Sequence, residues 1–185
     1  ILKSVNGIVV VDEAYIDFCP EQSVVSLLPS YPNLVVLQTL SKAWGLAGAR
    51  VGLALASPEI IGVMNNVKFP YNIGMPSINI AEKALLQKGE LPRRIEKIVV
   101  QRQLLTSALA KLPLVEKVYP SQANFLLIKT TNAKKIYEAL KAEGVVVRDR
   151  SNQPGCTNCL RITVGSPKEN RYLLKVLKSI NNQQQ

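Results

Sequence analysis

The sequence predicts an α/β fold in two parts. Short apolar runs of strand character alternate with segments of helical spacing along the chain, and this alternation is typical of α/β proteins. Apolar residues make up 47% of the 185 residues, which is enough to build a core. A helical pattern of roughly twenty residues begins at Pro92, and it is long against the usual helix of about a dozen. We therefore expect residues 1–92 to be part of a large domain with a mainly parallel sheet. Residues 93–185 should form a small α/β domain, with a connecting helix over about 92–112.

The first part of the chain is predicted to contain three strands and two helices. The strands are expected where short apolar runs occur, as in the buried strands of parallel sheets, at residues 8–12, 33–38 and 50–56. Ser57 suits the N-cap of a helix and Pro58 its first turn, while Gly89 suits the end of the second helix. The helices are expected at residues 59–68 and 77–88.

The second part is predicted to combine a partly antiparallel sheet with further helices. Its strands are expected at residues 115–119, 124–129, 145–148 and 160–164. A helix is expected at residues 133–142, stopped by Gly144. Ser166 and Pro167 then supply the N-cap and first position of a final helix.

Charge and composition narrow the classes of function. Lysine and arginine outnumber aspartate and glutamate by 23 to 13, which gives a formal net charge of +10. Such an excess occurs in proteins that bind nucleic acid. Here, however, the basic residues are spread out, and aromatic residues are only 5%, too few for base-stacking platforms. We therefore expect small-molecule substrates and no nucleic acid. No apolar run reaches the roughly 18 residues of a membrane span, so no membrane partner is expected.

The numbers of cysteines and histidines argue against a zinc site and against histidine-dependent nucleophilic catalysis. Cys156 and Cys159 form a Cys-x-x-Cys pair, but the chain has no second pair and no histidine. A structural zinc site needs four such ligands, so we expect no metal. Without histidine, Ser-His-Asp and Cys-His nucleophile systems are also excluded. We interpret the cysteines as loop thiols in a reducing compartment.

The segment 39–52, Thr-Leu-Ser-Lys-Ala-Trp-Gly-Leu-Ala-Gly-Ala-Arg-Val-Gly, carries the most specific chemistry. The hydroxyl of Ser41 and the guanidinium of Arg50 suit a phosphate, and the amine of Lys42 suits an aldehyde. Pyridoxal phosphate has both groups, and proteins hold it through a lysine Schiff base with an acidic partner for its ring nitrogen. Asp12 ends an apolar strand, and ligands of open α/β sheets bind beyond the carboxyl ends of strands. The sequence therefore predicts a pyridoxal-phosphate site, in which Lys42 would also move the substrate proton.

These residues resemble a known family. The blocks at 12–15 (Asp-Glu-Ala-Tyr) and 39–52 are similar to those of the fold-type I pyridoxal-phosphate aminotransferases. Three later stretches, at 122–125, 147–149 and 160–165, also resemble this family, and the two that contain Arg148 and Arg161 favour the histidinol-phosphate aminotransferase branch. The resemblance implies the C-terminal half of a fold-type I large domain followed by the small C-terminal domain. It also implies transamination between histidinol phosphate or imidazole acetol phosphate and glutamate or 2-oxoglutarate, in histidine biosynthesis.

By position in these motifs, the resemblance implies roles for the cofactor-binding residues. Lys42 would be catalytic and would bind the cofactor aldehyde covalently. Asp12 would pair with the pyridine nitrogen and Tyr15 with the ring hydroxyl. The cofactor phosphate would be held by Thr39, Ser41 and Arg50.

Two arginines in the second part would bind substrates. Arg161 would hold the carboxylate of the amino-acid co-substrate, and a fork-shaped cation suits that planar group. Arg148 would lie near the anionic end of the phosphorylated amine or keto substrate. The alternative for each arginine is a structural salt bridge.

The first residue is isoleucine rather than methionine, and the family's N-terminal half is not present in these residues. We therefore expect a piece of a longer protein that is weak or inactive alone. The parent protein is expected to be a cytoplasmic homodimer, although any targeting segment would precede these residues.

Four other functions remain open at the level of sequence. Within the same fold, the chain could belong to a threonine-phosphate decarboxylase or to an aromatic-amino-acid transaminase. From other classes, it could be the aminotransferase-like effector domain of a transcription regulator, or a non-catalytic basic binding domain.

Overall fold

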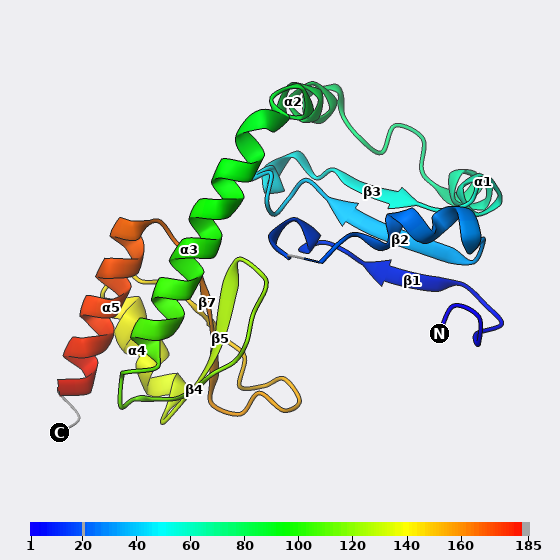
Figure 1. The fold of residues 1–185 in the computed structure, drawn as a ribbon. Coiled ribbons are helices and arrows are strands. Elements are labelled where there is room, and N and C mark those ends of the chain that lie inside the picture. The colour runs from blue at the N-terminus through cyan, green and yellow to red at the C-terminus, as the bar shows by residue number, and fades with distance from the viewer. Residues whose placement is uncertain (20, 183–185) are drawn as a thin grey trace. The chain divides into compact units, whose positions relative to one another are not determined.

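The computed structural model describes residues 1–19 and 21–182. The chain divides into two compact units, Ile1–Arg94 and Ile95–Gln185, and each is described by itself (Figure 1). The assignment of residues 1–92 and 93–185 to a cofactor-binding domain and a small domain stays a prediction.

The first unit contains a three-stranded sheet, in the order β1 (Val9–Asp12), β2 (Leu34–Thr39) and β3 (Gly52–Leu55) (Figure 1). β1 and β2 are parallel, and Asp12 lies opposite Leu37. Val36 in the middle of β2 is fully buried, as expected for a central strand. Because β1 and β2 run in the same direction, their carboxyl ends meet at one edge of the sheet.

The direction of β3 differs from the mainly parallel sheet that the sequence predicts. β3 runs antiparallel to β2, with Thr39 opposite Gly52. A parallel neighbour needs a crossover connection of about a dozen or more residues, usually a helix. Residues 40–51 contain only the short 3₁₀ turn Ala47–Ala49, so the chain reverses and returns beside β2. The sheet is therefore mixed, within an α/β fold.

Both predicted helices of this unit are confirmed, as α1 (Pro58–Val67) and α2 (Met75–Leu86). The predicted N-cap of α1 is also found, because the side chain of Ser57 accepts a hydrogen bond from the backbone N–H of Ile60 at 3.5 Å. α2 begins two residues before the predicted position, since a proline in its first turn is compatible with helix.

The second unit contains a four-stranded sheet, in the order β4 (Val115–Val118), β5 (Phe125–Thr130), β7 (Cys159–Thr163) and β6 (Arg148–Asp149). All three pairs of neighbours are antiparallel. Three strands lie where the sequence predicts them, but the strand expected at 145–148 is wrong in position.

The helix before β6 explains this shift. Gly144 has a left-handed φ of 73°. Its N–H donates to Lys141 O at 3.0 Å, and the N–H of Val145 donates to Leu140 O at 2.8 Å. This is the Schellman ending of a helix. Val145 therefore still belongs to the helix end, and ladder pairing starts only at Arg148.

Three helices contribute to the core of the second unit: α3 (Leu91–Leu109), α4 (Ala133–Ala142) and α5 (Pro167–Asn182). Alternate residues of β5 are buried, as are Leu160 and Ile162 of β7, so one face of the sheet lies against these helices. The residues with no exposed surface include Leu109, Ile128, Ile136, Leu140, Leu160 and Leu177. The predicted helix at 133–142 is confirmed at both ends.

Replacing Ile136 with alanine should lower the free energy of unfolding of this unit by about 2–5 kcal/mol, because it leaves a cavity in a close-packed core. Ile136 on α4 is fully buried. Urea unfolding followed by far-UV circular dichroism measures the change. Ile136→Val should cost less, about 0.5–1.5 kcal/mol. An equally small effect of both substitutions would contradict the assignment of Ile136 to the core.

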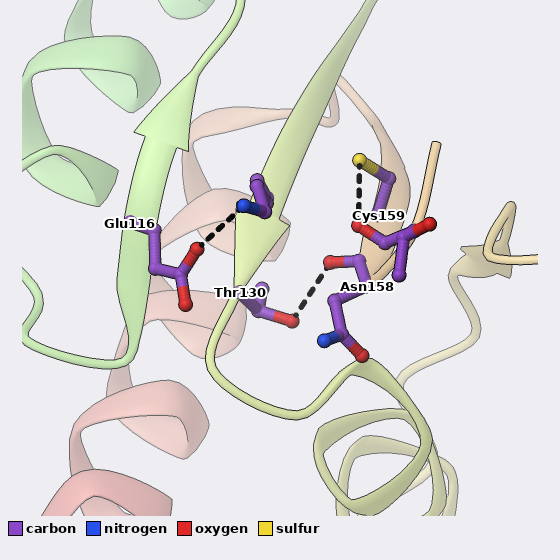
Figure 2. A network of polar contacts seen from close by, with 6 residues as sticks. Glu116, Thr130, Asn158 and Cys159 are labelled. Atoms are coloured by element: carbon purple, nitrogen blue, oxygen red, sulfur yellow. Dashed lines mark hydrogen bonds and ion pairs between the residues drawn. The ribbon is translucent and has the colours of Figure 1, made fainter. Parts of the chain in front are cut away.

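A polar network fixes the loop between β6 and β7 to β5 (Figure 2). The O–H of the fully buried Thr130 donates to Asn158 O at 3.1 Å, and its backbone N–H donates to the same oxygen at 2.9 Å. Nearby, Lys129 Nζ lies 3.1 Å from Glu116 across the β4–β5 pair. The hydrogen bonds to Asn158 O hold the residue before β7 beside the end of β5 (Figure 2), next to the paired residues Lys129 and Cys159.

The cysteines are free thiols, and Cys159 is buried. Burial, with a further contribution from the neighbouring Cys156, raises the pKa of the Cys159 thiol. The thiol of Cys159 is therefore neutral and weakly reactive at neutral pH. In the part of the chain that the structure describes, no helix has the length and apolar character needed to cross a bilayer.

Candidate functional site

The carboxyl ends of β1 and β2 carry the first group of predicted site residues. Asp12 is the last residue of β1 and Thr39 the last of β2, and the parallel pairing brings these ends to the same sheet edge. The carboxylate of Asp12 is exposed and accepts a hydrogen bond from Ala14 N at 2.9 Å. This edge is where open α/β sheets bind ligands.

Lys42 lies against Tyr15 at this edge. Its Nζ is 5.2 Å from the centre of the Tyr15 ring, and both residues are half-buried. No ion pair of Lys42 occurs among residues 1–19 and 21–182. The amine is thus held by an aromatic face rather than by a carboxylate, which leaves it available to react with a carbonyl compound.

The turn from β2 to β3 brings together three potential phosphate ligands. Thr39 Oγ1 lies 3.0 Å from Ser41 Oγ and accepts a hydrogen bond from Ser41 N at 3.1 Å. The N–H of Leu40 donates to Val51 O at 3.2 Å, which places the backbone of Arg50 next to these hydroxyls. The Arg50 guanidinium is exposed and donates to a backbone carbonyl at 3.0 Å. Two hydroxyls and a guanidinium on one turn suit an anion.

Arg50 itself has a left-handed backbone, with φ 57° and ψ 38°. Residues other than glycine rarely adopt this conformation, because their Cβ crowds the following carbonyl. Such strained positions cluster at functional sites.

Glu13 is a residue that the sequence reasoning missed. It follows Asp12, but the alternation of a strand points it to the opposite face, and it is only 6% exposed. Its carboxylate accepts hydrogen bonds from Ser23 Oγ (2.6 Å), Val24 N (2.8 Å) and Gln38 Nε2 (2.9 Å). Burial alone would raise the pKa of Glu13, but these three hydrogen bonds together lower it below 4.5. Glu13 therefore ties β1 to β2 and to the 3₁₀ segment Val24–Ser30 behind the sheet edge.

Replacing Glu13 with glutamine should lower the free energy of unfolding by about 1–3 kcal/mol at pH 7, because the buried donors lose a charged acceptor. Since the folded pKa of Glu13 lies below its ordinary value, its stabilisation is present above pH 4.5. That stabilisation is lost as the pH falls through the folded pKa. The difference between wild type and variant in urea unfolding should therefore shrink in acid. Glu82→Gln, at an exposed position on α2, is the matched control. A difference that stays constant with pH would contradict this role.

The second group of predicted residues lies in the other unit. Arg148 on β6 and Arg161 on β7 are directly opposite each other. They face a cleft of about 520 Å³, whose lining also includes Tyr137, Val147, Asp149, Arg150 and Thr163. Like charges directly opposite on paired strands repel, so an anion in this cleft would relieve the repulsion. Arg150, which the sequence reasoning did not select, adds a third cation.

Arg161 has an unused hydrogen-bond donor. Its Nε is buried and has no hydrogen-bond partner among the residues that the structure describes. A buried donor without a partner is costly, so this Nε–H is a candidate to pair with a bound group. Arg161 and the cluster around Lys42 lie in different units, so the predicted residues are described as two groups, one within each unit.

Comparison with known proteins places the chain among its relatives. The sequence model of the family described as "Aminotransferase class I and II" matches residues 1–177. The chain is 48% identical over 180 residues to the histidinol-phosphate aminotransferase of Parabacteroides distasonis, covering 97% of this chain and 52% of that protein. It thus spans about half the length of the curated relatives it matches.

Solved structures of an aminotransferase and of a decarboxylase have a fold similar to that of this chain. The histidinol-phosphate aminotransferase from Sinorhizobium meliloti, in complex with pyridoxal-5'-phosphate, matches with a TM-score of 0.86 and 25% identity, covering 96% of this chain and 50% of that one. The L-threonine-O-3-phosphate decarboxylase from Porphyromonas gingivalis matches with a TM-score of 0.84 and 25% identity, covering 94% of this chain and 55% of that one. Because the family model matches nearly the whole sequence, the chain belongs to the class I and II aminotransferases.

Proposed function

We propose that the full-length gene product is a pyridoxal-phosphate-dependent aminotransferase of histidine biosynthesis. It would transfer the amino group between histidinol phosphate and 2-oxoglutarate, with imidazole acetol phosphate and glutamate as the other pair. The observation that carries this proposal is the position of the Lys42 amine against Tyr15, at the sheet edge where Asp12 ends β1. The relatives' names support the choice of substrates.

The residues at this edge fit pyridoxal phosphate. Its phosphate matches the two hydroxyls and the guanidinium on the turn after β2, namely Thr39, Ser41 and Arg50. Its aldehyde matches the amine of Lys42, which has no ion pair in the described part of the chain. Its pyridine nitrogen matches the exposed carboxylate of Asp12, and its ring hydroxyl matches the phenol of Tyr15. When bound, the cofactor supplies an electron sink for the negative charge that develops at the amino-bearing carbon.

The chain's own residues then have two tasks at this edge. Lys42 Nζ acts as general base and takes the proton from the amino-bearing carbon of the donor. It later acts as general acid and supplies a proton to the corresponding carbon of the acceptor. Asp12 keeps a proton on the ring nitrogen by placing a negative charge beside it.

In the second unit, Arg161 would bind the carboxylate of glutamate or 2-oxoglutarate, and Arg148 would bind near the phosphate of the other substrate. The partnerless Nε of Arg161 supports the first role, because an Arg fork pairs with a carboxylate through two parallel N–H donors. The direct opposition of the two arginines supports an anion between them.

A substrate panel on the full-length gene product tests this proposal. Transamination of histidinol phosphate with 2-oxoglutarate should have a kcat/KM at least tenfold above that with phenylalanine or tyrosine. O-Phosphothreonine should release no carbon dioxide. Release of carbon dioxide with no histidinol-phosphate turnover would instead assign the chain to the decarboxylase branch. DNA binding that survives Lys42→Ala in a protein without turnover would assign it to a regulator.

We also propose that the full-length protein is a cytoplasmic homodimer that acts on small molecules. Large apolar side chains are exposed in and around the connection from α1 to α2, where Val67, Phe69 and Tyr71 are 78%, 83% and 98% exposed. Exposed apolar groups of this kind mark interfaces. Sedimentation velocity should give the mass of a dimer, and cell fractionation should place the protein in the cytoplasm. A monomer at micromolar concentration would contradict the dimer.

A further inference from the structure

The side chain of Arg161 rests on an aromatic ring. Its guanidinium carbon is 5.0 Å from the centre of the Phe125 ring. In the β5–β7 ladder Phe125 pairs with Thr163 and Leu127 with Arg161, so Phe125 and Arg161 are diagonal neighbours on one face. Diagonal neighbours lie within reach when one side chain is aromatic and the other long. This face is opposite to the one that packs on the helices, whose strand residues include the buried Leu126 and Ile128.

A turn stabilised by side-chain hydrogen bonds holds Phe125 at the start of β5. Ser121 Oγ donates to Phe125 O at 2.6 Å and accepts from Ala123 N at 3.1 Å. The guanidinium of Arg102 donates to Ala123 O at 2.9 Å. Arg102 on α3 is only 9% exposed, and it forms no ion pair in the described part of the chain. A buried cation thus serves the backbone of this turn, which is a costly use of charge for an ordinary loop.

The aromatic contact and the partnerless Nε belong to the same guanidinium. The Phe125 ring lies against the guanidinium of Arg161, with 5.0 Å between the ring centre and Cζ, and it limits the positions that this side chain can take. The buried Nε of the same guanidinium lacks a partner among the described residues. An arginine fixed in this way loses less conformational freedom when it pairs with a carboxylate.

We propose that Phe125 is a positioning residue for substrate recognition, which sets the Arg161 fork for an incoming carboxylate. The inference rests on the proposed carboxylate-binding role of Arg161 and extends it to a residue that touches no substrate. Loss of the aromatic face should weaken carboxylate binding by roughly two- to tenfold, the range expected for freeing one long side chain.

The test uses the 185-residue chain, glutarate as a non-reacting dicarboxylate probe, and NMR of the arginine Nε–H groups. The Arg161 signal is assigned by its absence in Arg161→Lys. In Phe125→Leu we expect the heteronuclear NOE of the Arg161 Nε–H to fall, because a freed side chain moves more, and the Kd for glutarate to rise two- to tenfold. Phe125→Tyr keeps the aromatic face and should stay within twofold of wild type. Leu104→Ala, at an exposed apolar residue on α3 in the same unit, should change neither readout.

The outcomes separate the inference from the function on which it rests. An unchanged NOE and an unchanged Kd in Phe125→Leu would overturn the inference. If wild type does not bind glutarate, the proposed role of Arg161 fails, and the NOE of the Arg161 Nε–H alone decides whether Phe125 restrains it. If Phe125→Leu does not fold, Ser121→Ala loosens the same turn without removing the ring. It should then lower the same NOE, and an unchanged NOE would overturn the inference.

Discussion

Replacing Lys42 with alanine should lower the transamination rate of the full-length gene product by roughly 10⁴-fold or more, because one amine serves both as covalent anchor and as proton carrier. The rate is measured as formation of glutamate from 2-oxoglutarate and histidinol phosphate. A second readout needs no turnover. Borohydride treatment of the 185-residue chain with pyridoxal phosphate should fix the cofactor on the peptide that contains Lys42, and this label should vanish in the variant.

Lys68→Ala is the matched control, because Lys68 is an exposed lysine of the same unit, at the end of α1. It should keep both the rate and the label on residue 42. Equal labelling of many lysines in wild type, with no preference for Lys42, would show that the amine beside Tyr15 is no more reactive toward the aldehyde than other lysine amines. The assignment of the catalytic centre to this edge would then be wrong.

Replacing Arg161 with alanine should raise the Michaelis constant for 2-oxoglutarate by roughly 30- to 5,000-fold, the equivalent of about 2–5 kcal/mol for a charged hydrogen-bonded pair. Arg161→Lys keeps the charge but loses the planar fork, so it should restore only part of the affinity. Half-reaction kinetics separate the two substrates. The step with histidinol phosphate should change much less than the step with 2-oxoglutarate.

Arg171→Ala, at an exposed position on α5, controls for the loss of one positive charge from the same unit. Its kinetics should match those of wild type. If Arg161→Ala instead impaired both half-reactions equally and lowered the unfolding temperature, Arg161 would have a structural role rather than one in carboxylate binding.

The sequence predicted well those helices whose ends are determined by residues close to them in the chain. Helix α4 is the clearest example, because Gly144, which the sequence offered as its stop, supplies the left-handed residue after its end. The structure adds a cap at the start that the sequence reasoning did not name, in which Asn132 accepts from Lys135 N at 3.0 Å. The direction of β3 depends instead on what the connection from β2 allows, and an apolar run carries no direction.

In the candidate site, too, the residues that are close in sequence could be predicted and those that meet only through folding could not. The block around Lys42 could be found because its residues are close in sequence and the turn brings them together. Glu13 could not be identified, because its partners Ser23 and Gln38 are 10 and 25 residues away and meet only in the folded unit. The contact between Phe125 and Arg161 likewise depends on strand register, which a single sequence does not determine.

The left-handed backbone of Arg50 has a consequence for protein engineering. Glycine would adopt φ 57° without steric cost, so a variant selected for heat resistance alone would favour glycine at this position. The same change would delete the guanidinium from the turn that we assign to the cofactor phosphate. Stability and cofactor affinity therefore oppose each other at a single residue, and consensus or thermostability screens on this chain should be run with the cofactor present.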